Sequence, residues 1–153
     1  MKIEMNSTIV DIIAVLFTIL FLYTGISKLS DYSIFKEQIA TSSLLSPIAG
    51  IISIIVPWTE FLVVVLLIVP RWRLNGLIAC LILMIAFTGY IIAILLFNKH
   101  IPCSCGGILE QLSWKAHLYF NSAFTILALI GILLEKKMNR ESRIKLASIL
   151  KTE

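Results

Sequence analysis

The chain has 153 residues, of which 59% are hydrophobic and only 14% are charged, and its mean hydropathy is +0.97. Soluble domains usually contain about 25% charged and about 45–50% apolar residues, so this composition excludes an ordinary soluble globule. The length suits one compact membrane domain and is too short for two.

Four apolar runs are long enough for the roughly 20 residues that a transmembrane helix needs. The pattern therefore predicts an all-α integral membrane protein built as a four-helix transmembrane bundle. Residues 1–135 would form the membrane domain and residues 136–153 a basic cytoplasmic tail, either an amphipathic helix on the inner leaflet or a solvated segment. The predicted spans cover approximately residues 9–29, 48–69, 74–97 and 116–134.

The distribution of Lys and Arg predicts the orientation. With the N-terminus inside, nine of the 13 basic residues fall on inner segments, as the positive-inside rule requires. Both termini would then be cytoplasmic, and the loop between the third and fourth spans would lie on the outer, periplasmic side of a bacterial inner membrane. The net charge of +4 thus reflects topology and does not indicate nucleic-acid binding.

Two connections and one proline within a span carry further signals. Residues 28–47 form the longer outer connection, where a short helix capped by Asp31 or Ser33 is expected along the membrane surface. Pro57 should kink the second span. The turn at 70–75 is so short that spans two and three are expected to be antiparallel neighbours.

Cys103 and Cys105 are separated by one residue in the outer loop. Their Cα atoms can lie about 5.5–7 Å apart, which is the upper end of the range for a disulfide. Such a small ring is strained and easily reduced. Redox exchange is the favoured interpretation, and a static disulfide, a metal site or incidental thiols are the alternatives.

Metal binding has weaker support in the sequence, because a structural zinc site needs four ligands. His100, Cys103 and Cys105 resemble a clip for a soft metal such as copper(I), with His117 as a fourth candidate, but no second ligand cluster accompanies them. No metal ligand is therefore assigned. Cys80 lies about 30 Å along the helix from the loop and is expected to be a buried apolar residue.

Trp114, His117 and Asn121 are spaced i, i+3, i+7 and share one face of the fourth span. His117 would lie within reach of the cysteine loop, where it could accept a proton from a thiol or stabilise a thiolate. The alternative is an interfacial histidine contacting headgroups, with Trp114 as a belt aromatic.

Glu60 lies deep in the second span, where an ionisable group is costly and usually has a partner inside the bundle. Lys28 at the outer end of the first span is the first candidate, followed by His117 and Asn121. A structural clamp and a proton-transferring carboxylate are both open. Near the inner interface, Asp11 is expected to cap or to contact water.

Three stretches, GISKLSDYSIFKEQI at 25–39, PWTEFLVVVLLI at 57–68 and PCSCGGILEQLSWKAHLYFN at 102–121, together resemble the MauE branch of the DoxX-like membrane proteins. The resemblance implies a four-helix membrane bundle that helps to mature the disulfide-rich small subunit of methylamine dehydrogenase with a thioredoxin-like partner. It implies that Cys103 and Cys105 are the redox pair and that Lys28 and Glu60 are motif positions.

The leading hypothesis is therefore a thiol–disulfide oxidoreductase of the inner membrane that exchanges with a thioredoxin-like protein or a disulfide-containing client. Cys103, Cys105 and His117 would be catalytic. Candidates for binding a cofactor are Glu60, Lys28, Trp114 and Asn121, and a quinone is an open candidate for that cofactor. The alternatives are a non-catalytic membrane scaffold with a structural disulfide and a copper(I) or heavy-metal handling protein.

Overall fold

The structure is a computed structural model that describes residues 2–41, 45–97 and 114–150. Within these ranges all regular secondary structure is helical. The elements in chain order are α1 (Lys2–Ser30), α2 (Tyr32–Thr41), the 3₁₀ turn η1 (Ser46–Ile48), α3 (Ala49–Ile68), the 3₁₀ turn η2 (Pro70–Trp72), α4 (Arg73–Phe97) and α5 (Trp114–Ile149).

Four of these helices, α1, α3, α4 and α5, are long and apolar enough to cross a membrane. All four also expose large apolar side chains, among them Ile19, Leu62, Ile82 and Leu133. Such extensive apolar exposure is typical of helices that face lipid. The predicted all-α, four-helix membrane fold is confirmed, and a lipid bilayer is its environment.

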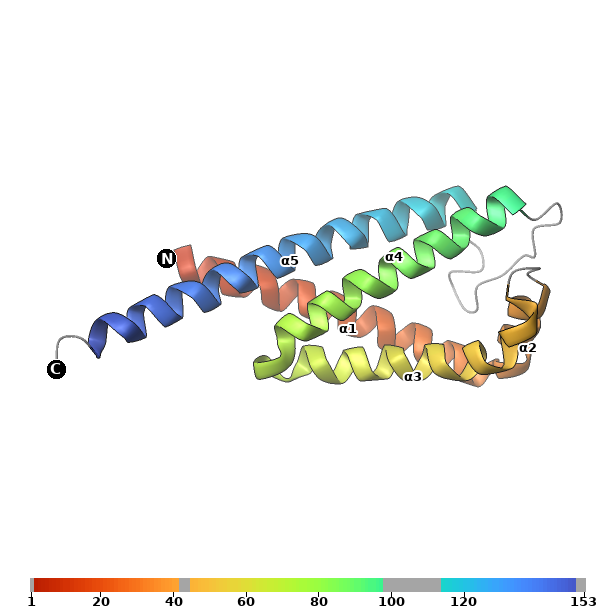
Figure 1. Ribbon diagram of the computed structural model, residues 1–153, viewed down its shortest axis with the longest axis horizontal. Coiled ribbons are helices and arrows are strands. Elements are labelled where there is room, and N and C mark those ends of the chain that lie inside the picture. Colours follow the sequence, from red (N-terminus) through yellow and green to blue (C-terminus); the bar gives the residue numbers. More distant parts are fainter. Residues whose placement is uncertain (1, 42–44, 98–113, 151–153) are drawn as a thin grey trace.

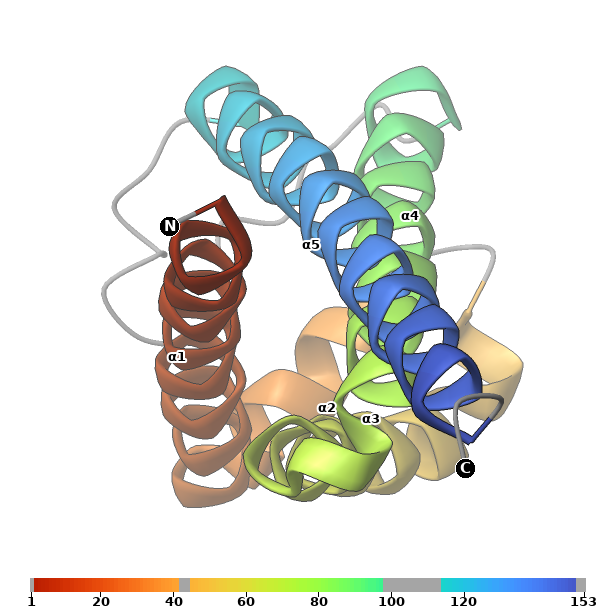
Figure 2. The same cartoon turned by 90° about the vertical axis from the view of Figure 1, so that its left-hand side faces the viewer.

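The four long helices pack around a common interior. α1 contacts α3 and α5, and α4 contacts the same two helices from the other side (Figure 2). α1 and α4 run in one direction, and α3 and α5 return (Figure 1). Both described ends of the chain therefore lie at one end of the bundle, and α2 lies at the other. The turn η2 joins α3 to α4, which are antiparallel neighbours as predicted.

The predicted short helix after the first span is present and begins at Tyr32, so Asp31 directly precedes it. The carbonyl of Asp31 accepts a hydrogen bond from the N–H of Phe35 at 2.9 Å. α2 packs on α3, and the hydroxyl groups of Tyr32 and Ser53 are joined by a hydrogen bond of 3.2 Å. Ile39 is buried on the bundle side, so α2 closes one end of the interior.

A tightly packed apolar core occupies the part of the bundle nearer the termini. Its members come from all four long helices and include Val10, Phe17, Leu77 and Ala128. Close approach is possible because of small residues. A Cβ added to Gly76 would lie 3.0 Å from backbone atoms of α3, so only glycine lets α4 fold back against the end of α3.

The helix ends differ from the predicted spans at two places. α1 begins at Lys2 rather than near residue 9. α5 continues to Ile149 as one helix of 36 residues, or about 54 Å, which exceeds the hydrocarbon thickness of about 30 Å. Residues 136–149 of the predicted tail therefore continue the helix of the fourth span.

Candidate functional site

The site is built around a buried ion pair between α1 and α3. Nζ of Lys28 lies 2.7 Å from Oε1 of Glu60, and the side chains are 17% and 0% exposed, respectively. Glu60 follows Pro57 by one turn inside α3. Lys28 therefore supplies the partner that a carboxylate at this depth needs.

Surrounding groups orient the ammonium group of Lys28. Nζ also lies 3.5 Å from the carbonyl oxygen of Thr24, one turn earlier in α1. It lies 5.8 Å from the ring centroid of Phe35 and 5.7 Å from that of Phe87, within the range of cation–π attraction. α1, α2 and α4 thus all contribute to holding this cation next to Glu60.

The carboxylate of Glu60 uses only one of its two oxygens. Oε2 is buried and has no hydrogen-bond partner among the described residues. The hydroxyl of Thr24 lies close enough to interact with the Glu60 carboxylate, and it also lies 3.4 Å from the carbonyl of Phe21, to which it can donate. Because it has no partner, Oε2 can still accept a hydrogen bond. A buried acceptor left without a partner is energetically costly, so a donor placed there would be stabilising.

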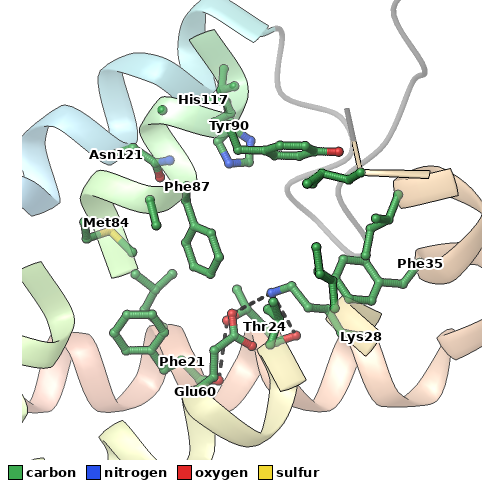
Figure 3. A pocket seen from close by; sticks show the side chains of 18 of the residues that line it. Phe21, Thr24, Lys28, Phe35, Glu60, Met84, Phe87, Tyr90, His117 and Asn121 are labelled. Carbon is green, nitrogen blue, oxygen red and sulfur yellow. Dashed lines mark hydrogen bonds and ion pairs between the residues drawn. The ribbon is translucent and has the colours of Figure 1, made fainter. Parts of the chain in front are cut away.

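α5 brings two polar side chains to the same interior. His117 and Asn121 are one turn apart, and Asn121 is 4% exposed. Its Nδ2 is buried and unpaired among the described residues. In Figure 3 the amide of Asn121 and the ring of His117 point toward the space above Glu60 and Lys28. Three helices therefore direct polar groups at one region.

That region is a cavity of about 520 Å³ lined by all five α-helices. Its wall is mainly apolar and aromatic, with Phe21, Phe35, Phe87, Tyr90 and Phe120 among the lining residues. The polar groups are few and converge, which is typical of a small-molecule site. Lys28, Glu60, His117 and Asn121 all line it.

The remaining predicted residues are less fully described. Cys103 and Cys105 lie outside the described residues, as does His100. Trp114 is the first residue of α5, and the position of its side chain is likewise outside the description. Cys80 is 0% exposed in the apolar core, as predicted. Among the residues described, no three His, Cys, Asp or Glu side chains are grouped to hold a metal.

Several contributors to this site and a second polar cluster were not predicted from the sequence. Tyr90 and Thr24 line the cavity, and their polar atoms within apolar spans were the available signal. At the termini end, Asp11 pairs with Arg73 at 2.7 Å, a contact that the expectation of capping or water did not include. Glu135 is also buried there, 7% exposed.

The fold and cavity define a four-helix membrane protein with a buried ion pair at the base of an apolar, aromatic-lined pocket. The family model described as Methylamine utilisation protein MauE matches residues 6–134. Since this match covers most of the chain, the protein belongs to the MauE family, which confirms that part of the resemblance. Comparison with curated proteins and with solved structures returned no match.

Proposed function

We propose that this MauE-family membrane protein exchanges thiols and disulfides through Cys103 and Cys105. The observation that carries the proposal is the Cys-x-Cys pair followed by two glycines between two membrane spans. The small ring closed by such a pair favours a disulfide that cycles over one that only staples the loop.

The described residues support a particular location for this chemistry. The C-terminal end of α4 and the N-terminal end of α5 flank residues 98–113, and both lie at the α2 end of the bundle (Figure 1). The cavity is lined by α2 and by His117 near the start of α5. The helices on either side of the segment that contains Cys103 and Cys105 therefore meet the end of the bundle that carries the polar cavity, which supports the proposal.

The exchange itself follows ordinary thiolate chemistry. A thiolate of a thioredoxin-like protein or of a client attacks one sulfur of the Cys103–Cys105 disulfide, and the other cysteine leaves as a thiolate. The second client thiol then attacks the mixed disulfide and releases the first cysteine. Two electrons and two protons have moved to the pair, the client holds a disulfide, and the reverse sequence reduces it. His117 is proposed to exchange protons with the departing thiolates.

The compartment is part of the proposal. Both described chain ends lie at one end of the bundle (Figure 1), and the basic residues concentrate on the segments at that end. This distribution supports cytoplasmic termini and a cysteine segment on the outer side of a bacterial inner membrane, where disulfides form. By family, the client is proposed to belong to methylamine utilisation.

The test is the redox state of the loop cysteines in living cells. In a Cys80→Ala background, cells are acid-quenched and alkylated with a mass-tagged maleimide before and after a brief dithiothreitol pulse. We expect the pulse to reduce the pair and reoxidation to follow within minutes. Cys103→Ser or Cys105→Ser should trap a mixed disulfide with the partner, whereas Ser104→Ala should cycle normally.

Two outcomes would overturn the proposal. A pair that stays oxidised through the pulse is a structural staple, which would make the protein a scaffold. Undiminished disulfide transfer by Cys105→Ser would exclude a two-cysteine mechanism. Fusing a periplasmic reporter to the C-terminus tests the orientation separately, since cytoplasmic termini predict an inactive reporter.

A further inference from the structure

The cavity has a charge balance that restricts its ligand. Lys28 and Glu60 are the oppositely charged members of its lining, and they already pair with each other at 2.7 Å. A ligand with an ionised head would add an uncompensated charge to a largely apolar space, which is expensive. A neutral head avoids that penalty.

The unpaired polar atoms define which neutral head fits. Glu60 Oε2 has capacity to accept a hydrogen bond, and Asn121 Nδ2 has capacity to donate one, because neither has a partner within the described part of the chain. A complementary ligand therefore carries a hydroxyl that donates to Glu60 and an oxygen that accepts from Asn121. Each such contact removes the penalty of leaving a buried polar atom unsatisfied.

The wall indicates the rest of the ligand. Phe21, Phe87, Phe120 and Tyr90 line the cavity, and aromatic side chains pack well against another flat ring. The volume of about 520 Å³ lies within the usual range for small-molecule sites, about 300–1,000 Å³. Because the cavity lies within membrane-spanning helices, a ligand that dissolves in lipid can reach it.

From these features we infer that the cavity binds a neutral, lipid-soluble ring compound of the hydroquinone and quinone class. The hydroquinone form has hydroxyls that donate to Glu60 Oε2 as well as oxygens that accept from Asn121 Nδ2. The quinone form can only accept hydrogen bonds. The reduced form therefore binds more tightly than the oxidised form.

α4 offers a position at which this binding can be blocked. Ala86 and Gly89 both line the cavity and are exposed. A Cβ added to Gly89 would meet no other atom within 4 Å, so a larger side chain can be accommodated without displacing a helix. Gly89→Phe should fill space beside the ligand while the bundle keeps its fold.

The experiment measures binding of decylubiquinone and its hydroquinone by calorimetry to the full chain in lipid nanodiscs, with empty nanodiscs as the blank. The chain carries Cys103→Ser and Cys105→Ser, so that no exchange with thiols occurs and binding is separated from the function proposed above. We expect saturable binding at one ligand per chain, at least severalfold tighter for the hydroquinone. Decanoate, which has a similar chain and a charged head, should not compete.

Three substitutions test the assigned contacts. Asn121→Leu should weaken both forms by about tenfold, the usual effect of losing one buried hydrogen bond, while Ser122→Leu on the exposed face next to it should not. Glu60→Gln should abolish the preference for the hydroquinone, because an amide can also donate to a quinone carbonyl. Gly89→Phe should remove saturable binding.

The inference is overturned if binding only partitions with lipid, or if Asn121→Leu and Gly89→Phe both bind as the parent chain does. It is also overturned if decanoate competes, which would make the cavity a fatty-acid site. Should Asn121→Leu fail to fold, the loss of redox preference in Glu60→Gln and the effect of Gly89→Phe still decide. A failure here leaves the cysteine exchange untouched, because that reaction is measured without added quinone.

Discussion

The two ends of the bundle carry ion pairs of equal length in very different surroundings. Lys28–Glu60 and Asp11–Arg73 both measure 2.7 Å, yet Glu60 is 0% exposed whereas Asp11 is 52% exposed. The first pair lines a cavity, and the second lies beyond the close-packed apolar core that includes Phe17 and Leu77. Distance alone therefore does not reveal what an ion pair contributes, because burial determines both its energy and its accessibility to a ligand.

Removing the cation of the buried pair should have the largest effect on stability. We expect Lys28→Met to lower the free energy of unfolding by about 3–5 kcal/mol, because it leaves a buried carboxylate without its partner. Unfolding in mixed micelles followed by circular dichroism measures the change. Lys36→Met on the exposed side of α2 is the control and should be nearly neutral.

A double variant sharpens this comparison. Lys28→Met combined with Glu60→Leu removes both charges and should recover more than half of the lost stability, since an apolar pair can replace a buried ion pair. If the double variant is no more stable than Lys28→Met alone, the loss reflects packing of the lysine stem and not the unpaired charge.

Glycines in the two regions should respond differently to the same small change. Gly76→Ala places a Cβ 3.0 Å from backbone atoms of Leu66 and Leu67 and should reduce stability by about 1–3 kcal/mol, as overpacking usually does. Gly89→Ala adds a methyl group where no atom lies within 4 Å. It should be neutral or stabilise the helix by up to about 1 kcal/mol.

The same micelle unfolding assay compares the two glycine variants directly. Equal gains for both would show that the backbone entropy of glycine, and not the local packing near each glycine, controls the response. A loss confined to Gly76→Ala would support a close-packed termini end and an open cavity end.

The smallest effect is expected at the exposed pair. Asp11→Asn removes the charge from a side chain that is 52% exposed, so it should change stability by less than about 1 kcal/mol. The change should diminish further in high salt, because exposed charges are screened. A loss as large as that of Lys28→Met would contradict the contrast between the two ends, and would indicate that Asp11 acts together with Arg73 and the buried Glu135.

The sequence by itself determined the membrane environment, the four spans, the short helix after the first span and the MauE family. These properties depend on local patterns: apolar runs of sufficient length, Pro and Asp near helix starts, and motifs read in order. It also singled out Lys28, Glu60, His117 and Asn121, because a polar or charged group inside an apolar run is conspicuous, and it named the other three as candidate partners of Glu60.

Only the tertiary structure decided that these four residues meet at one cavity and that Arg73 pairs with Asp11. Both facts depend on how each helix is rotated about its axis and on how closely neighbouring helices approach, which small residues such as Gly76 and Gly131 permit. The sequence pattern also did not predict that α5 continues to Ile149. The hydrophobic signal ends where the helix leaves the lipid, whereas the backbone hydrogen bonds that define the helix continue.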